Sequence, residues 1–157
     1  MNYRIRQARK NDYMLLDEFI YEAIFIPEGM EAPPKSIINQ QDIQVYVSDF
    51  GKKKDDYCLL AEVDEVVVGA AWVRIMNDYG HLDSETPSLA ISVYNEYRGH
   101  GIGTALMEQL LISLKEKGYK KTSLAVQKAN YAYKLYLKVG YEIVDENEEE
   151  YIMVRYF

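Results

Sequence analysis

The chain is poor in the side chains that build disulfides and metal sites, with one cysteine and two histidines among 157 residues. The single cysteine, Cys58, excludes an internal disulfide framework, and its apolar surroundings predict a small buried side chain. His81 and His100 are isolated in the sequence, so they cannot supply the ligand set of a zinc site and we expect no metal. The H-E-x-x-H motif of zinc proteases and the G-x-S-x-G motif of serine hydrolases are both absent.

Long hydrophobic runs are also missing. The longest, Val66–Val73, has eight residues and contains a glycine, whereas a membrane-spanning helix needs about twenty. Met1–Arg6 holds no apolar stretch of the kind that a secretory signal peptide requires. We therefore expect a cytoplasmic protein with no membrane partner. The 48% share of hydrophobic residues excludes a disordered chain, and the length predicts a single domain over residues 1–157.

The charge balance is acidic, since 18 lysines and arginines against 25 aspartates and glutamates leave a net charge of −7. An acidic surface repels a phosphate backbone, so we expect no nucleic-acid partner. It suits a cationic ligand such as an amine, and it is equally a common means of keeping a protein soluble.

The hydrophobic pattern predicts a mixed α/β sheet of about seven strands flanked by about four helices, in the order β-α-α-β-β-β-α-β-α-β-β. We expect a first helix from Asn11 or Asp12, a second from Ser36 or Asn39 to Gly51, and a hairpin around Asp64-Glu65. The other predicted segments are strands at 3–8, 57–63, 66–75, 88–93, 122–126, 141–144 and 151–157, helices at 101–117 and 130–138, a loop at 26–34, and a solvated acidic hairpin turn at 145–150.

The richest local signal lies where a predicted strand ends at Val93 and an amphipathic helix begins near Gly101. Gly99, Gly101 and Gly103 alternate there. Glycines let backbone N–H groups turn toward one point, and a helix N-terminus carries partial positive charge, so the pattern predicts an anion site suited to phosphate. Arg98 and Thr104 add a guanidinium fork and a hydroxyl to this site.

Two familiar phosphate motifs do not fit these glycines. No lysine follows them, as a P-loop requires, and their spacing is not the G-x-G-x-x-G of dinucleotide-binding domains. The chain after the loop is also too short for the further strand–helix units of such a domain.

Two motifs resemble the GNAT superfamily of acetyl-CoA-dependent N-acetyltransferases. The first is similar to that family's R-x-x-G-x-G/A signature, and the second to its L-Y-x-K-x-G-F segment. In this chain they read Arg98-Gly99-His100-Gly101-Ile102-Gly103 and Leu135-Tyr136-Leu137-Lys138-Val139-Gly140-Tyr141. Their order, their spacing and the predicted element order, which covers the whole chain, agree with the family.

The resemblance implies that acetyl-CoA binds at the glycine loop, with backbone N–H groups of Arg98 to Thr104 around its pyrophosphate. It implies that the strand at Ile91 to Val93 pairs with the pantetheine arm, which enters where this strand and the next one splay apart. The family often has an asparagine seven residues before the motif tyrosine. This chain has Ala129 there and Asn130 one residue later, so Asn130 is interpreted either as a cofactor contact or as a helix cap.

The resemblance also makes Tyr136 the candidate general acid that protonates the leaving thiolate, and the backbone N–H of Val93 a candidate oxyanion donor. The base is unresolved among water and several carboxylates, namely Glu28, Asp83, Glu85 and Glu62. No placed nucleophile favours a covalent intermediate, so we expect direct transfer in a ternary complex.

The predicted function is transfer of an acetyl group to a primary amine of a small molecule or peptide. Acceptor specificity is expected in the loop Phe25–Pro34, the turn Asn77–Pro87 and the acidic hairpin tip. A non-catalytic CoA-binding sensor is the alternative from another class, and transfer to a hydroxyl or of a longer acyl chain is a third. Exposed strands would allow a homodimer, which nothing in the pattern requires.

Overall fold

The computed structural model describes all residues from 1 to 157, and its strands form one seven-stranded sheet in the order β1-β2-β3-β4-β5-β7-β6. The strands are β1 (Arg4–Gln7), β2 (Tyr57–Val63), β3 (Val66–Arg74), β4 (Ser88–Val93), β5 (Lys121–Gln127), β6 (Glu142–Glu146) and β7 (Glu150–Tyr156). The helices are η1 (Lys10–Leu15), α1 (Leu16–Ala23), η2 (Lys35–Asn39), α2 (Gln41–Gln44), η3 (Asn95–Tyr97), α3 (Ile102–Glu116) and α4 (Ala132–Lys138), where η denotes 3₁₀ geometry. All neighbouring strands are antiparallel except β4 and β5, so the predicted fold class is confirmed.

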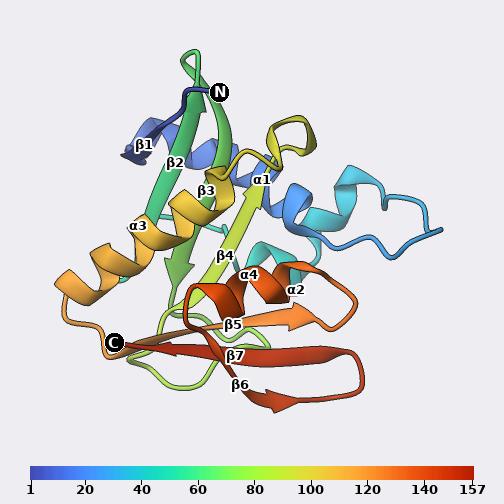
Figure 1. Ribbon diagram of the computed structural model, residues 1–157, viewed down its shortest axis with the longest axis vertical. Coiled ribbons are helices and arrows are strands. Elements are labelled where there is room, and N and C mark those ends of the chain that lie inside the picture. The colour runs from blue at the N-terminus through green and yellow to red at the C-terminus, as the bar shows by residue number, and fades with distance from the viewer.

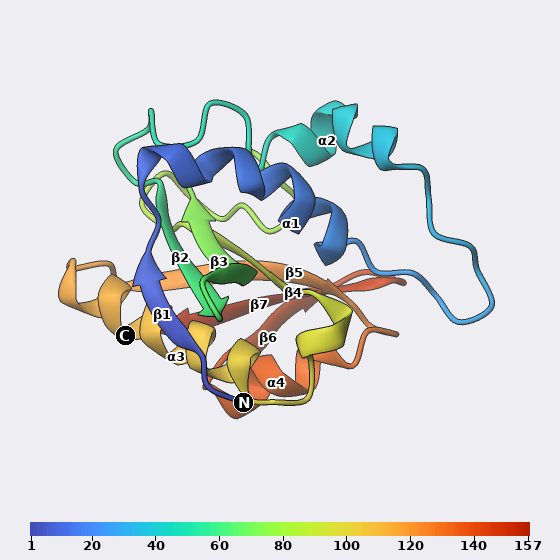
Figure 2. The same cartoon turned by 90° about the horizontal axis from the view of Figure 1, so that it is seen from above.

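Helices cover both faces of the sheet, because β2 and β3 are apolar on both sides. Cys58, Leu60 and Trp72 pack with α1, whereas the alternate residues Leu59 and Val73 pack with α3. Figure 2 shows α1 and α2 on one side of the sheet and α3 and α4 on the other. Cys58 is the buried apolar side chain that the sequence predicts, and burial raises the pKa of its thiol.

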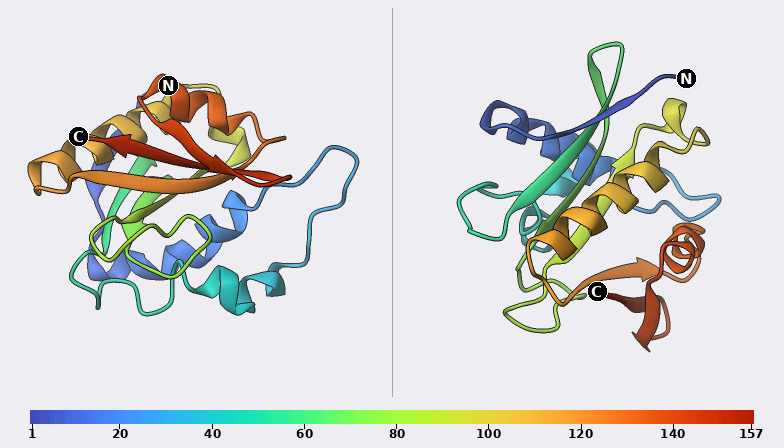
Figure 3. Two further views of the ribbon diagram at one scale, coloured as in Figure 1. Left: turned by 90° about the horizontal axis from the view of Figure 1, so that it is seen from below. Right: turned by 60° about the vertical axis from the view of Figure 1, so that its left-hand side comes forward.

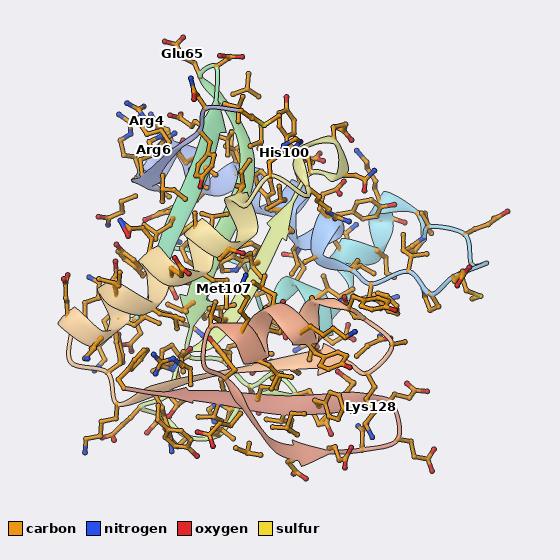
Figure 4. All side chains as sticks on the ribbon, viewed as in Figure 1. Arg4, Arg6, Glu65, His100, Met107 and Lys128 are labelled. Atoms are coloured by element: carbon orange, nitrogen blue, oxygen red, sulfur yellow. The ribbon has the colours of Figure 1, made fainter.

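The helix α3 follows the predicted periodicity closely. Its buried side chains are Ile102, Leu106, Met107, Leu110, Leu111 and Leu114, whereas Ala105, expected among them, is half-buried. Met107 lies on the part of α3 that faces the body of the protein (Figure 4). The helix ends at Glu116, and Gly118 after it has a φ of +91°, the left-handed conformation that a glycine stop requires.

The second predicted helix is much shorter than expected. The chain forms η2, an extended residue at Gln40, the single turn of α2, and then irregular turns up to Gly51. A residue far along the chain, Arg74, accounts for the shorter helix. Nη1 of Arg74 donates to the carbonyls of Val45 (3.1 Å) and Ser48 (2.7 Å), groups that a longer helix would have kept for its own bonds.

The strands β4 and β5 diverge, as the resemblance implies. Their pairing has one register pair, Ser88 with Ser123, and the amide of Ser123 donates to Pro87 at 3.1 Å. Beyond that point β4 runs with β1–β3, while β5 turns away with β7 and β6 (Figure 1). The view at the right of Figure 3 shows the two halves of the sheet at a large angle. The divergence leaves the carboxyl ends of β4 and β5 without a shared ladder.

None of the helices is long and apolar enough to span a membrane. The side chains also form no group of three or more histidine, cysteine or acidic residues arranged to hold a metal ion.

Candidate active site

The glycine loop joins β4 to α3 and leaves the first amides of the helix without partners. Gly99 and Gly101 have φ of +80° and +84°, a conformation that other residues adopt only with strain. Gly101 is the N-cap and supplies no side chain, and the first intrahelical bond runs from Ala105 to Gly101 at 3.0 Å. The N–H groups of the first turn of α3 are therefore available to an anion, with the helix dipole behind them.

These amides face a cavity of about 930 Å³. An added Cβ at Gly99 or Gly101 would meet no protein atom within 4 Å, so the loop borders open space large enough for a diphosphate group. Of the predicted cofactor-binding residues, all but one line this cavity, namely Ile91, Val93, Arg98, Gly99, Gly101, Ile102, Gly103, Thr104 and Asn130. The exception is His100, which lies exposed in the loop before α3 (Figure 4).

Arg98 reaches back to the strand instead of standing free. Its Nε donates to the carbonyl oxygen of Val93 at 2.8 Å, and Nη2 lies 3.8 Å from a carboxylate oxygen of Glu22. The guanidinium therefore holds the end of β4 against the loop, while its remaining N–H groups stay at the cavity.

The backbone of β4 presents polar groups to the gap beside β5. The amide of Tyr94 donates to Val68 on β3, and the carbonyl of Pro87 accepts from Ser123 on β5. Because alternate residues of a strand direct their N–H and C=O groups to opposite neighbours, Ile91 and Val93 direct theirs toward β5. The strands have separated at this level, so an extended ligand can bond to these groups as an added strand would.

A second cavity of about 210 Å³ adjoins the first. It lies between the middle of β4, the carboxyl half of β5, the end of α1 and the α2 segment. Six residues line both cavities: Ala23, Ile24, Phe25, Ile91, Asn130 and Tyr136. At these shared residues, a ligand group bound in the larger cavity can contact a ligand group bound in the smaller one.

Tyr136, the predicted acid, lies on α4 at this boundary. It is 8% exposed, and burial raises the pKa of its phenol to about 12. The phenol is therefore protonated at neutral pH, the state that a proton donor requires.

Asn130 serves as a helix cap in this structure. Its Oδ1 accepts the amide of Ala132 at 2.9 Å, in the first turn of α4. Since it also lines both cavities, its Nδ2 group is what remains for a ligand.

The four carboxylates considered as bases do not line either cavity. Glu62 pairs with Arg4 and Arg6 at 2.7 and 3.0 Å, and Figure 4 shows these two arginines at the opposite end of the view from Lys128. Asp83 accepts the Thr86 hydroxyl at 2.7 Å, which lowers the pKa of Asp83.

Glu28 and Glu85 are exposed.

A carboxylate that the sequence does not single out lines the second cavity. Glu150, expected in a solvated turn, is the first residue of β7, pairs with Gln127 of β5 and is half-buried. The prediction of a fully solvated segment is wrong for this residue, because the antiparallel pairing of β5 and β7 reaches one residue farther than the apolar pattern indicates.

Two of the three segments expected to set acceptor specificity reach the cavities. From the first loop, which extends far from the body of the protein (Figure 3, left), Phe25 and Ile26 line the larger cavity. From the hairpin, Glu150 lines the smaller one. The turn Asn77–Pro87 lines neither cavity. It contacts the wall of the second cavity indirectly, because Asp78 accepts a hydrogen bond of 3.0 Å from the hydroxyl of Tyr46, which lines that cavity.

Tyr46 forms part of the wall of the second cavity and is fixed at both ends. Asp78 holds its hydroxyl, and Nε1 of Trp72 donates to its carbonyl at 3.1 Å. Trp72 itself is fully buried in the core and lines neither cavity.

Comparison with known proteins agrees with this geometry. Residues 18–141 match the acetyltransferase (GNAT) family. The ribosomal protein bS18-alanine N-acetyltransferase of Haemophilus influenzae is 38% identical over 61 residues, which is 39% of this chain and 42% of that protein. The match to this curated relative therefore spans less than half of either protein.

Solved structures share the fold over nearly the whole chain. The PaiA N-acetyltransferase of Thermoplasma acidophilum, in complex with coenzyme A, superposes with a TM-score of 0.72 at 20% identity and 100% coverage of both chains. The ribosomal-protein-S18-alanine N-acetyltransferase of Escherichia coli gives 0.69 at 16% identity, covering 99% of this chain and 94% of that one. At such identities the likeness concerns the fold, whereas the family match covers most of the sequence as well. The chain belongs to the acetyltransferase (GNAT) family.

Proposed function

We propose that this acetyltransferase moves an acetyl group from acetyl-CoA, the acetyl donor of its family, to a primary amine by direct transfer in a ternary complex. The observation that supports this most strongly is the pair of adjoining cavities with Tyr136 at their boundary. The larger cavity contains the glycine loop, and the smaller one adjoins it and is lined mainly by hydrophobic residues. The acetyl donor and the amine then approach each other beside Tyr136.

In this proposal the chain's own groups hold the cofactor at two places. The free amides of the first turn of α3 bind the pyrophosphate, and Arg98 keeps that loop fixed to β4. The gap-facing backbone groups of Ile91 bond to the pantetheine arm, whereas at Val93 the N–H is the group left free, because Arg98 donates to its carbonyl oxygen. The carbonyl that reacts thereby lies near the amide of Val93, which supports the developing oxyanion.

Tyr136 completes the reaction by donating its proton to the thiolate sulfur that leaves. A phenol whose pKa lies near 12 keeps its proton until a strong acceptor forms beside it. The same position between two cavities favours turnover over a sensor that only binds acetyl-CoA.

Direct transfer is supported by the absence of an activated nucleophile at the boundary. Ser92 lines the larger cavity, but its hydroxyl donates to the carbonyl of Phe19 at 2.6 Å and has no base beside it. Cys58 is buried in the core and lines neither cavity. A covalent acyl-enzyme would need one of these groups to be exposed and deprotonated.

The acceptor is a primary amine of a small molecule or peptide. The relatives named for ribosomal-protein alanine support a peptide amine, and the small second cavity supports any acceptor whose amine-bearing end is slender. The test is acetyl transfer from acetyl-CoA to short peptides beginning with alanine and, in parallel, to simple alkylamines. Calorimetric titration of acetyl-CoA into the wild type and into Gly101→Glu accompanies it.

We expect binding to the wild type, loss of binding in Gly101→Glu, and turnover with at least one amine class. A wild type that binds no acetyl-CoA would contradict the assignment of the loop. One that binds it and acetylates no amine would contradict the acceptor.

A further inference from the structure

The second cavity contains one charged side chain. Apolar groups from α1, β4 and β5 form most of its wall, including Ile20, Leu89 and Leu124, and Glu150 is the only charged residue among its lining residues. Glu150 is partly buried in this wall, and burial of a carboxylate with no cation beside it disfavours its ionised form. The composition of this wall therefore indicates what the cavity takes up.

Glu150 is held in place by its backbone. Its amide donates to Oδ1 of Asn147 at 2.7 Å and its carbonyl accepts the amide of Asn147 at 3.0 Å, while Nδ2 of Asn147 donates to the hydroxyl of Tyr79 at 2.8 Å. The turn before β7 is thus braced from the neighbouring loop, and β7 pairs with β5 from Glu150 onward. The backbone that places Glu150 at the cavity wall is therefore fixed.

No cation of the protein pairs with the Glu150 carboxylate. Lys128, which directly follows β5 and is labelled in Figure 4, pairs with Glu146 at 2.6 Å and lies over the ring of Tyr151. The other titratable groups around the cavity are Tyr46, whose hydroxyl already donates to Asp78, and Tyr136.

The surroundings of Glu150 disfavour its ionised form. Burial and the neighbouring Glu149 both raise the pKa of Glu150, because both disfavour its charged form. Tyr46 stays neutral, since burial first and then Asp78 raise the pKa of its phenol. A positively charged ligand beside Glu150 would favour the ionised carboxylate.

We propose that Glu150 pairs with the ammonium group of the acceptor in the second cavity and takes its proton, so that the acceptor class is a primary amine on an apolar carbon chain. This inference rests on the proposed function and adds the base and the substrate chemistry to it. The cavity of about 210 Å³ is smaller than the roughly 300–1,000 Å³ of sites that enclose a whole drug-sized ligand. It therefore holds the amine-bearing end, and the rest of the acceptor extends outward.

The proton transfers balance. Glu150 receives one proton from the ammonium and later releases it to solvent. The neutral nitrogen forms a C–N bond with the thioester carbon, and the C–S bond breaks. Tyr136 gives its proton to the departing sulfur. The nitrogen then gives up its second proton, and Tyr136 takes this proton. The products are an amide and a free thiol, with one proton released.

The test is the pH dependence of kcat/KM for an alkylamine in three proteins: wild type, Glu150→Gln and Glu142→Gln. Glu142 lies exposed on β6 of the same hairpin, so its substitution removes an equal charge away from the cavity. At pH 7 we expect Glu150→Gln to lose about 100-fold in kcat/KM, the lower range for a general base, and Glu142→Gln to match the wild type. As the pH approaches the pKa of the amine, about 10, the deficit of Glu150→Gln should shrink, because the amine then arrives neutral.

Three outcomes overturn the inference. A deficit of Glu150→Gln that stays constant across the pH range, or no deficit, would show that Glu150 takes no proton from the acceptor. Acetyl-CoA binding, measured by calorimetry, should be the same in all three proteins and reports that the variants are folded. A wild type that binds acetyl-CoA but acetylates no amine would overturn the proposed function and this inference with it, whereas an active wild type with parallel profiles overturns only the role of Glu150.

Discussion

Nε of Arg98 donates to the carbonyl oxygen of Val93 at 2.8 Å, so one guanidinium joins the last residue of β4 to the first residue of the glycine motif. In the proposed complex the pantetheine arm binds β4 and the pyrophosphate binds the glycine loop, and this hydrogen bond connects the two segments. If the two segments shifted apart, the two sets of backbone donors would lose their common geometry. Arg98 thus acts on the loop through Val93 as well as through its charge.

Replacing Arg98 with alanine should weaken acetyl-CoA binding at least about tenfold. A hydrogen bond from a charged group contributes about 1.5–3 kcal/mol, and about 1.4 kcal/mol is a tenfold change in affinity. Arg98→Lys keeps the charge and should recover part of the loss, because an ammonium provides no fork that reaches Val93 and the cofactor together. Calorimetry on both variants measures this. Equal affinity of Arg98→Ala and the wild type would contradict the role of the bond.

The glycines of the loop should differ in how well they tolerate alanine. Gly101 has a φ of +84°, where an L-residue costs roughly 1–2 kcal/mol, so Gly101→Ala should lower both the free energy of unfolding and the affinity for acetyl-CoA. Gly103 has an ordinary helical φ, and an added Cβ would come no closer than 4.0 Å to Leu135 and Val93. Gly103→Ala should therefore bind acetyl-CoA nearly as the wild type does. Urea unfolding and calorimetry on the pair test this, and equal effects of the two substitutions would contradict it.

A buried ion pair supports the wall of the second cavity from behind. Arg74 and Asp56 form two bonds of 2.9 and 3.0 Å, and their side chains are 2% and 0% exposed. Because Arg74 also binds the carbonyls of Val45 and Ser48, it positions the segment that carries Tyr46. Asp56→Asn should lower the free energy of unfolding by about 3–5 kcal/mol, since it leaves a buried charge unpaired.

The comparison for that variant is Asp49→Asn, which removes an exposed pair with Lys52 at 3.4 Å. Exposed pairs contribute about 0–1 kcal/mol, so chemical denaturation should show little change there. A loss in Asp56→Asn as small as that in Asp49→Asn would contradict the structural role of the buried pair.

Acid should destabilise the protein partly through Asp12. Its carboxylate binds Nη1 and Nη2 of Arg6 at 2.7 and 3.1 Å, and this contact holds the pKa of Asp12 at about 2. The folded-state pKa is lower than the value of about 3.9 in an unfolded chain, so this stabilisation is present above that value and is lost as the pH falls toward 2. The free energy of unfolding should therefore decrease less steeply from pH 5 to pH 2 in Asp12→Asn than in the wild type. Urea titrations at several pH values measure the slope, and the exposed Asp17→Asn should keep that of the wild type.

The parts of the site that could be predicted from sequence are those set by local backbone geometry. The left-handed φ of Gly99 and Gly101 follows from residue type, and the amphipathic helix behind them follows from periodicity. The position of Tyr136 needed the second motif, because one tyrosine among fifteen has no distinguishing local signal.

The remainder depends on contacts between distant segments. The second helix is interrupted by Arg74, which follows it by about thirty residues and whose bonds to Val45 and Ser48 no local pattern encodes. Glu150 is one of several acidic residues in a row, and only the pairing of β7 with Gln127 places it at the second cavity. A weak signal was present, since strand pairing commonly extends to the residues that close a hairpin.

The two neighbouring tyrosines Tyr136 and Tyr141 provide the sharpest test of the proposed acid. Their ring centroids are 6.0 Å apart and burial raises the pKa of both, but Tyr136 lines the two cavities and Tyr141 lines neither. Tyr136→Phe should lower kcat by at least about 100-fold and leave acetyl-CoA affinity unchanged, because it removes a proton that is donated only as the sulfur departs. The buried hydroxyl of Tyr141 forms no well-aligned hydrogen bond, since the Thr122 hydroxyl beside it donates to the carbonyl of Pro87, so Tyr141→Phe should keep full activity and unfold at an equal or higher urea concentration. Steady-state kinetics on both variants decides the matter: a wild-type kcat in Tyr136→Phe, or an equal loss in Tyr141→Phe, would mean that another group protonates the thiolate.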